Sequence, residues 1–301
     1  MENTAKNLSH ILLIVNKTVP EEDISSFCTN VRSDNPDTEL TYLCYDNQVG
    51  RDPGDLSVNL TNSLPEERRS LFMITDSGEA AQFAEENDIA CAALDTGNGS
   101  DARLSRLLYC IEDIGYMTYA RVNRMWQRHH GIPWIIKETD RLIIREQILS
   151  DIDALYEIYD DDETRKYVED LYEDRKAEER YLRDYIDNQY RFHEYGLWAL
   201  TLKDTGELIG RAGIGIREGY DIPELGYVIG KKYRRMGYAA EALAAIISYG
   251  REELGLFEYM AFTSRKNTPS VRLLEKLGFS RSGKDVIMGR EHDMYLLTLG
   301  Q

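Results

Sequence analysis

The chain of 301 residues carries 36 lysines and arginines against 53 aspartates and glutamates, so its formal net charge is −17. Its apolar fraction of 42% excludes a disordered chain, and its length accommodates two domains of about 150 residues each. An acidic chain lacks the basic surface that a nucleic-acid backbone requires. We therefore expect a globular protein that has no nucleic-acid partner.

Neither a membrane segment nor a metal site is expected. No run of 18 apolar residues is present, and the five histidines show no spacing typical of metal ligands. The four cysteines (Cys28, Cys44, Cys91 and Cys110) lie far apart and form no CxxC pair. This cysteine usage is typical of a reducing compartment. The sequence predicts a cytoplasmic protein without a metal and without a membrane partner.

The first half of the chain alternates strand-like and helix-like segments. Strands are predicted at residues 10–15, 39–44, 70–75 and 89–94, and helices at residues 21–31, 79–87, 104–111 and 116–130. Such alternation is typical of a small Rossmann-like α/β domain with helices on the faces of its sheet. We expect this part to be an accessory, non-catalytic domain that spans residues 1–136.

The second half, residues 137–301, predicts a mixed and twisted α/β sheet. Strands are predicted at residues 139–147, 197–202, 207–216, 224–229 and 258–263, with a last pair of strands within 279–299. Helices are predicted at residues 150–160, 162–190, 238–254 and 269–277. The segment Asp204-Thr205-Gly206 predicts a hairpin turn between the second and third of these strands.

One stretch of the second half has the features of an anion-binding turn. A predicted strand ends near Gly230, and a basic turn over residues 231–235 leads through Gly237 into an alanine-rich helix. The unpaired N–H groups of a first helical turn and the helix dipole both favour an anion. Gly237 and the small Ala239 and Ala240 leave the backbone open to close approach. The pattern predicts a site for a pyrophosphate group.

Two motifs in this half resemble those of a known family. The spacing R-x-x-G-x-A that starts at Arg234 resembles the acetyl-CoA pyrophosphate loop of the GNAT acetyltransferase superfamily. The segment NTPSVRLLEKLGF that starts at Asn267 is similar to the second signature of that superfamily. The resemblance covers residues 139–300 and is closest to the ribosomal-protein N-terminal acetyltransferase branch. It implies a GNAT fold, which is a twisted mixed sheet with flanking helices.

The resemblance also implies which residues bind acetyl-CoA. Main-chain groups of Val228 and Ile229 would hold the pantetheine arm and polarise the thioester, and the N–H groups of residues 235–240 would hold the pyrophosphate. The implied cofactor contacts are Tyr227, Val228, Ile229, Arg234, Arg235, Met236, Gly237, Tyr238, Ala239, Ala240, Asn267 and Ser270.

Two residues are candidates for the proton transfers. Glu224, at the head of the cofactor strand, is the candidate base for the attacking amine, and a solvated strand-end acid is the alternative. Many relatives have a tyrosine at the position of Leu274. The leucine side chain here cannot donate a proton. Ser270 is therefore the candidate acid, and the alternative role of Ser270 is to cap the helix that follows.

The predicted function is acetyl-CoA-dependent transfer of an acetyl group to a primary amine, either a protein N-terminus or a small cationic amine. The sequence leaves the oligomeric state open, including a homodimer. Because Leu274 replaces the usual tyrosine, the alternative is a regulatory or sensor protein that binds CoA through a catalytically weak GNAT domain.

The first half resembles in part a degenerate haloacid dehalogenase-like domain around Asp76. In that family the first strand should end in a nucleophilic aspartate, but the residues after Val15 include no carboxylate. An unrelated α/β domain, in which Asp76 is only a helix cap, is the alternative.

Overall fold

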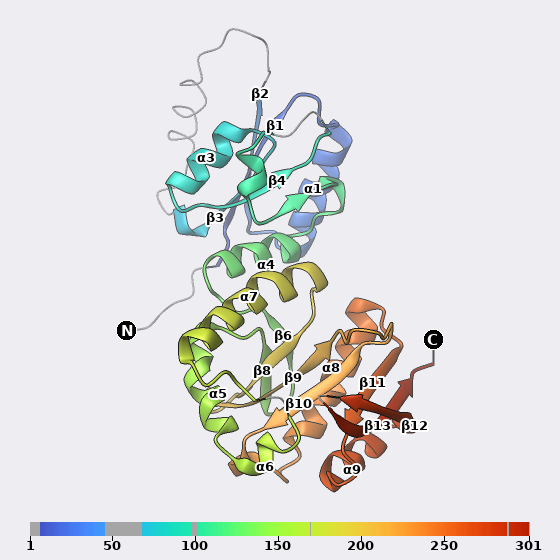
Figure 1. Cartoon of the computed structure of the whole chain (residues 1–301). Helices are drawn as coiled ribbons and strands as arrows, with labels where there is room; N and C mark the ends of the chain where they lie inside the picture. The colour runs from blue at the N-terminus through green and yellow to red at the C-terminus, as the bar shows by residue number, and fades with distance from the viewer. Residues whose placement is uncertain (1–6, 46–67, 98–100, 169, 288, 301) are drawn as a thin grey trace. The chain divides into compact units, whose positions relative to one another are not determined.

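The computed structural model describes residues 7–45, 68–97, 101–168, 170–287 and 289–300 (Figure 1). The chain forms two compact units, Met1–Ile132 and Pro133–Gln301, and each has its own sheet and its own core. The predicted boundary after residue 136 falls inside β6 (Ile135–Glu138), which pairs with β7 (Leu142–Arg145) of the second unit.

The first unit contains a parallel sheet in the order β2-β1-β3-β4-β5. Its strands are β1 (His10–Asn16), β2 (Glu39–Tyr45), β3 (Leu71–Thr75), β4 (Ala90–Leu94) and β5 (Cys110–Ile111). This is the order of flavodoxin-like doubly wound sheets, in which consecutive strands are added first on one side of β1 and then on the other. The Rossmann-like α/β architecture predicted for this half is therefore present.

Helices cover both faces of this sheet. The helices in the described part of the unit are α1 (Glu21–Asp34), α3 (Gly78–Glu86) and α4 (Tyr119–His129). Successive residues of β1 point to opposite faces: Ile11 and Leu13 pack in the core formed with α1 and α4, and Leu12 and Ile14 pack in the core formed with α3. This explains why β1 is a continuous apolar run rather than an alternating one.

Two predictions for the first unit are wrong. Residues 104–111 were expected to be helical, but the structure has a short 3₁₀ turn, η2 (Leu104–Arg106), followed by β5, which pairs with β4. Asp76 does not cap α3, because the Oγ atom of Ser77 accepts the hydrogen bond from Ala80 N. Asp76 instead accepts hydrogen bonds from Asn16 N at 3.0 Å and from Tyr45 Oη at 2.8 Å. Its carboxylate thus ties together the ends of three neighbouring strands.

The second unit contains an eight-stranded sheet in the order β12-β13-β11-β10-β9-β8-β7-β6. Its remaining strands are β8 (Leu197–Leu202), β9 (Leu208–Gly215), β10 (Glu224–Ile229), β11 (Glu258–Thr263), β12 (Ser280–Ile287) and β13 (Arg290–Thr298). Only β10 and β11 are paired in parallel among these neighbours, and the other pairs are antiparallel. The mixed sheet predicted for this half is therefore confirmed.

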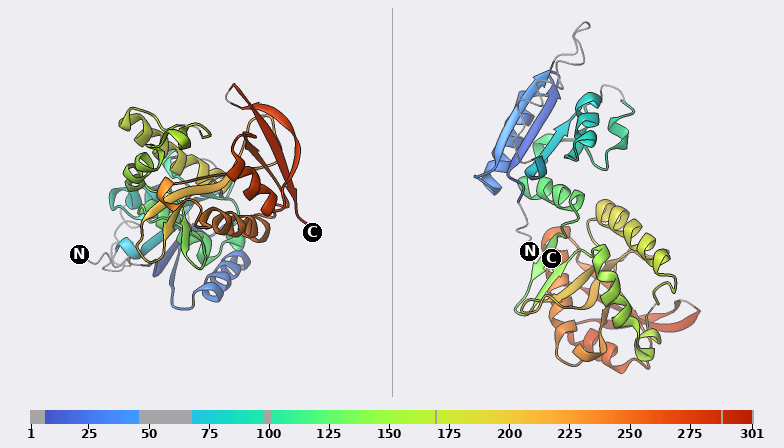
Figure 2. Two further views of the ribbon diagram at one scale, coloured as in Figure 1. Left: turned by 90° about the horizontal axis from the view of Figure 1, so that it is seen from below. Right: turned by 90° about the vertical axis from the view of Figure 1, so that its left-hand side faces the viewer.

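Helices pack on both faces of this sheet as well (Figure 2). They are α5 (Ile152–Tyr159), α6 (Asp162–Arg165), α7 (Arg175–His193), α8 (Tyr238–Leu254) and α9 (Thr268–Lys276). The neighbours Trp198 and Ala199 show the two faces, because Trp198 packs in the core with α8 and Ala199 packs in the core with α5.

The single helix predicted over residues 162–190 is wrong in its middle. The chain leaves helical geometry after α6 and starts again at α7, where Asp174 caps the helix by accepting from Lys176 N at 3.1 Å. Asp161 caps α6 in the same way by accepting from Thr164 N at 3.1 Å. The acidic residues that looked like one solvated helix are in part helix caps.

Candidate functional site

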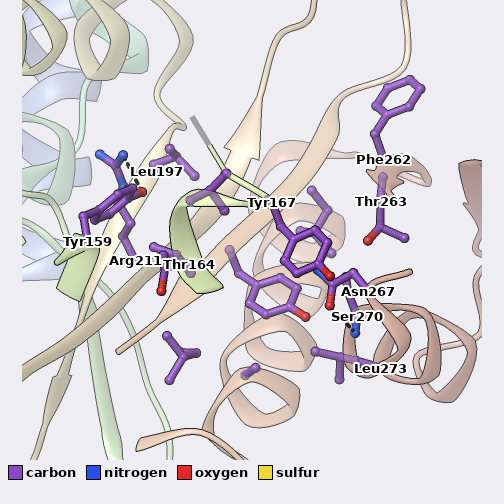
Figure 3. A pocket seen from close by; sticks show the side chains of 18 of the residues that line it. Tyr159, Thr164, Tyr167, Leu197, Arg211, Phe262, Thr263, Asn267, Ser270 and Leu273 are labelled. Atoms are coloured by element: carbon purple, nitrogen blue, oxygen red, sulfur yellow. Dashed lines mark hydrogen bonds between the residues drawn. The ribbon is translucent and has the colours of Figure 1, made fainter. Parts of the chain in front are cut away.

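The parallel strands β10 and β11 open into a V in the middle of the sheet. Their register contains only the pair of Glu224 and Met260, whereas β10 pairs with β9 over its whole length. A cavity of about 1040 Å³ lies at this opening, and it is lined by β9, β10, β11 and the helices α5 to α9 (Figure 3). The opening lies between the two strands that the sequence predicted to hold acetyl-CoA.

The register decides which main-chain groups of β10 face the opening. Gly230 N donates to Ile209 O of β9 at 2.8 Å. Because antiparallel strands bond at every second residue, the main chain of Val228 also faces β9, and that of Tyr227 and Ile229 faces the opening. The main chain of Tyr227, rather than that of Val228, is therefore the one that lies beside Ile229 at the opening. The Val228 side chain packs in the core beside α5.

The turn after β10 forms a cradle of N–H groups. Arg235 and Gly237 have left-handed backbone conformations, with φ of 63° and 88°, and α8 starts directly after Gly237 without a side-chain cap. Within the described chain, none of the six N–H groups from Arg235 to Ala240 donates to a protein acceptor. These N–H groups and the helix dipole together suit an anion such as a pyrophosphate.

Arg141, which the sequence analysis missed, supports this cradle from the turn between β6 and β7. Its Nη1 atom donates to Met236 O at 3.0 Å, its Nε atom donates to Glu241 at 2.7 Å, and its guanidinium lies 4.3 Å from the centre of the Tyr238 ring. Burial would raise the pKa of Glu241, but hydrogen bonds from Thr139 and Arg141 outweigh burial and lower it. The sequence around Arg141 contains no local pattern that predicts its contact with Met236, which lies 95 residues further along the chain.

Most of the basic side chains in the turn are already paired. Lys231 and Arg234 each lie 3.1 Å from Asp161, and Lys232 pairs with Glu207. Arg235 has no ion pair among the described residues. The attraction for an anion at this turn therefore comes from the backbone N–H groups and Arg235 rather than from the whole basic run.

Asn267 and Ser270 line the opposite side of the cavity at the start of α9 (Figure 3). The Asn267 side chain is the N-cap, and it accepts from Ser270 N at 3.4 Å. The alternative role of Ser270 as the cap is therefore wrong, because Ser270 lies inside the first turn of the helix.

Leu274 is 2% exposed and belongs to the core. Tyr227 is a phenol that the sequence analysis did not weigh as an acid; burial raises its pKa, and a hydrogen bond with Ser270 opposes that rise.

Glu224 lies at the vertex of the V and is not a solvated acid. Its Oε2 atom accepts from Nε of Arg217 at 2.6 Å and lies 2.6 Å from Nη2 of the same guanidinium, and the Glu224 side chain is 19% exposed. Burial raises the pKa of Glu224, and the charge of Arg217 opposes the rise. A half-buried carboxylate with a raised pKa and an open face on a cavity has the properties of a general base.

The far end of the cavity contains residues that the sequence analysis also missed. Arg211 of β9 and Tyr159 of α5 lie together there, near Leu197 and away from Asn267 and Ser270 (Figure 3). The cavity therefore extends from the N–H cradle across β10 to the Arg211–Tyr159 pair, where a second substrate could lie, whereas the vertex of the V is at Glu224, nearer the other end of β10.

Two further observations concern the described residues as a whole. They contain no cluster of three or more histidine, cysteine, aspartate or glutamate side chains that could hold a metal ion. Among their helices, none combines the length and the apolar character needed to cross a membrane.

Comparisons with known proteins agree on one family for the second unit. Residues 141–280 match the model of the acetyltransferase (GNAT) domain family. The N-acetyltransferase p20 of Bacillus licheniformis is 30% identical over 166 residues, which are 54% of this chain and 93% of that protein. The ribosomal protein uS5 alanine N-acetyltransferase of Escherichia coli is 33% identical over 118 residues, which are 36% of this chain and 61% of that protein.

One solved structure is similar to about half of this chain. A protein described as a GnaT-family acetyltransferase from Bordetella pertussis is 26% identical and covers 54% of this chain and 98% of its own, with a TM-score of 0.46.

Proposed function

The chain belongs to the GNAT family of N-acetyltransferases, and from this premise we propose that it transfers the acetyl group of acetyl-CoA to a primary amine. The observation that carries the proposal is the run of N–H groups from Arg235 to Ala240, which find no acceptor in the described part of the chain, beside the opening between β10 and β11. An anion at this cradle would lie at one end of the cavity, and the vertex of the V would lie further inside it.

The residues present fit acetyl-CoA. The six N–H groups and Arg235 would bind the pyrophosphate, and the main chain of Tyr227 and Ile229 would align the pantetheine arm at the opening of the sheet. Asn267 would contact the arm from α9. When bound, acetyl-CoA supplies the acetyl group as a thioester, so that transfer breaks a C–S bond and forms a C–N bond.

Glu224 would act as the base in this reaction. Its carboxylate would take the proton that the amine must lose, and Arg217 would keep it oriented through the hydrogen bond from Nε and the ion pair with its guanidinium. Ser270 or Tyr227 would donate a proton to the departing sulfur, because both side chains face the cavity and Leu274 has no proton to give. The N–H groups that face the opening would stabilise the charge that develops on the thioester oxygen.

The acceptor is a primary amine, and two classes of amine are candidates. The E. coli relative is named for its action on the alanine of ribosomal protein uS5, which makes a protein N-terminus one candidate acceptor for this chain. A small cationic amine is the other candidate.

The test is thiol release from acetyl-CoA in the presence of a panel of amines, combined with the thermal shift that acetyl-CoA causes. We expect acetyl-CoA to raise the unfolding temperature and at least one amine to accelerate thiol release. Absence of both effects would refute the proposal. Stabilisation by acetyl-CoA without release for any amine would instead support the alternative function of a CoA-binding regulatory protein.

A further inference from the structure

Arg211 is the charged residue at the end of the cavity that the proposed reaction leaves unused. It lies on β9 in register with Val228 of β10, and side chains of paired residues on neighbouring strands share one face of the sheet. Its guanidinium therefore lies on the face that α5 covers, next to Tyr159 (Figure 3). This is one strand away from the main-chain groups proposed to hold the thioester.

The only hydrogen bonds of the Arg211 side chain among the described residues go to a neutral group. Its Nε and Nη2 atoms donate to Tyr159 Oη at 2.9 Å and 2.7 Å. Burial raises the pKa of Tyr159, so the phenol stays protonated at neutral pH and does not balance the positive charge. A guanidinium has five N–H donors, and three of those of Arg211 have no protein partner in the described chain.

The Nη1 atom of Arg211 is open to the cavity rather than sealed in the interior. Arg211 lines the cavity, and Nη1, which has no hydrogen-bond partner among the described residues, is absent from their fully buried unpaired atoms. A partly buried guanidinium without a counter-ion is costly, and a carboxylate is the group that its planar donor pair fits best. The unused donors therefore form a preformed binding site for an oxyanion.

The neighbouring charges do not occupy this site. Arg217 forms an ion pair with Glu224, and Arg234 forms one with Asp161. Arg211, in contrast, has no carboxylate within ion-pair distance among the described residues. Glu178 acts on Arg211 only through a longer-range Coulomb interaction. Glu178 is 2% exposed, and its carboxylate accepts a hydrogen bond from Tyr172 N at 3.0 Å.

We propose that Arg211 binds the carboxylate of an acceptor that is a small molecule with both a primary amine and a carboxylate, such as an amino acid. The inference rests on the proposed function, and it narrows the acceptor away from purely cationic amines such as polyamines. Tyr159 holds the guanidinium in place, so little side-chain entropy is lost when the carboxylate binds. The amine of the same molecule would then extend along the cavity toward Glu224.

The test compares each amino acid with its own amide, in which the carboxylate is replaced by a neutral group of nearly the same shape. The probes are the common amino acids, 4-aminobutyrate and the corresponding amides, and the measured quantity is kcat/KM from thiol release. In the wild-type protein, the best acid should exceed its amide. In Arg211→Met, the acid-to-amide ratio should fall by about tenfold to a hundredfold, as loss of a charge-assisted pair predicts. Comparing ratios cancels the intrinsic difference in reactivity between acid and amide.

Three variants serve as controls. Arg183→Met removes an exposed arginine of α7 that does not line the cavity, so its ratio should stay at the wild-type value. Tyr159→Phe removes the phenol oxygen but keeps the charge of Arg211, so it should retain most of the preference for the acid. Arg211→Lys keeps the charge without the fork and should give an intermediate ratio, which serves as the test if Arg211→Met does not fold.

The outcomes distinguish a failure of this inference from a failure of the proposed acetyltransferase function. If no probe and no other amine releases thiol, the proposed function fails. If amines release thiol but amides or carboxylate-free amines are as good as the acids, the inference about Arg211 is overturned and the acetyltransferase function stands. Equal acid-to-amide ratios in the wild type and in the folded Arg211 variants would overturn it as well.

Discussion

At the scale of single residues, the site is built from charged groups whose partners decide their roles. Glu224 and Arg211 both line the cavity, but Glu224 forms an ion pair with Arg217, whereas the described residues offer Arg211 only a neutral phenol. The pairing of Glu224 with Arg217 explains how a buried carboxylate can remain ionised while burial raises its pKa. The identities of the two residues in the sequence do not show that Glu224 is ion-paired and that Arg211 bonds to a phenol.

Replacement of Glu224 by glutamine should lower kcat by about a hundredfold or more, because general-base catalysis typically contributes that much. Steady-state thiol release with saturating amine measures the effect. The matched control is Glu258→Gln, which alters an exposed glutamate at the start of β11. A Glu224→Gln protein with unchanged kcat would show that another group accepts the proton.

The pH dependence of activity should report the same residue. Glu224 acts only when ionised, so kcat/KM should fall as the pH falls through its raised pKa. Because the charge of Arg217 lowers that pKa, Arg217→Met should move the acid limb of the profile to higher pH. A profile that stays in place, or that moves to lower pH, would contradict the assignment.

At the scale of the elements, the anion cradle depends on one glycine at the start of α8. Gly237 has φ of 88°, and a Cβ atom there would lie 3.4 Å from Nη2 of Arg141, within the structure that supports the turn. The cradle is therefore a property of the strand–turn–helix unit and of the arginine behind it.

Gly237→Ala should lower the stability of the unit by about 1 kcal/mol, because a left-handed conformation is costly for alanine, and should also weaken acetyl-CoA binding. Chemical denaturation and titration calorimetry measure the two effects. Gly219→Ala is a suitable control, since Gly219 has φ of 86° and a Cβ atom there would meet nothing within 4 Å. The control should lose similar stability and keep its affinity. Equal affinities in the two variants would count against the cradle.

At the scale of the whole molecule, the two units have separate cores, and the first unit contains two histidines whose pKa values are lowered. Burial lowers the pKa of His130 in the first unit to about 4, and the charges of His129 and Arg69 act in the same direction. Burial also lowers the pKa of His10 in that unit. Both histidines are therefore more easily protonated in the unfolded chain than in the folded one.

The stability that neutral His130 contributes is present above pH 6.5, the value for the unfolded chain, and is lost as the pH falls toward 4. At pH 5 the loss should be about 2 kcal/mol. We expect hydrogen exchange of the α4 amides near Trp126 to accelerate between pH 7 and pH 5 beyond its intrinsic pH dependence. His130→Asn should reduce that acceleration, and identical protection profiles for the two proteins would contradict the prediction.

Elements with a strong local signal could be predicted from the sequence. The predicted bounds of β10, α8 and β11 agree with the structure at every residue, because a strand-to-helix turn with Gly237 and a helix that ends before Gly255 are coded locally. The short strands β5 and β6 were missed, since strands of two and four residues exist only through pairing with β4 and β7.

The sequence by itself determined the two-unit α/β organisation, the family and the position of the N–H cradle, because these depend on periodicity, glycine and spacing along the chain. Only the tertiary structure decided that Arg141 supports the cradle, that Arg217 holds Glu224, and that Arg211 has no carboxylate at ion-pair distance among the described residues. Each of these facts depends on which side chain lies opposite another across the sheet. Charge pairing acts over distances in space, and the register of the strands, rather than the order of the chain, sets those distances.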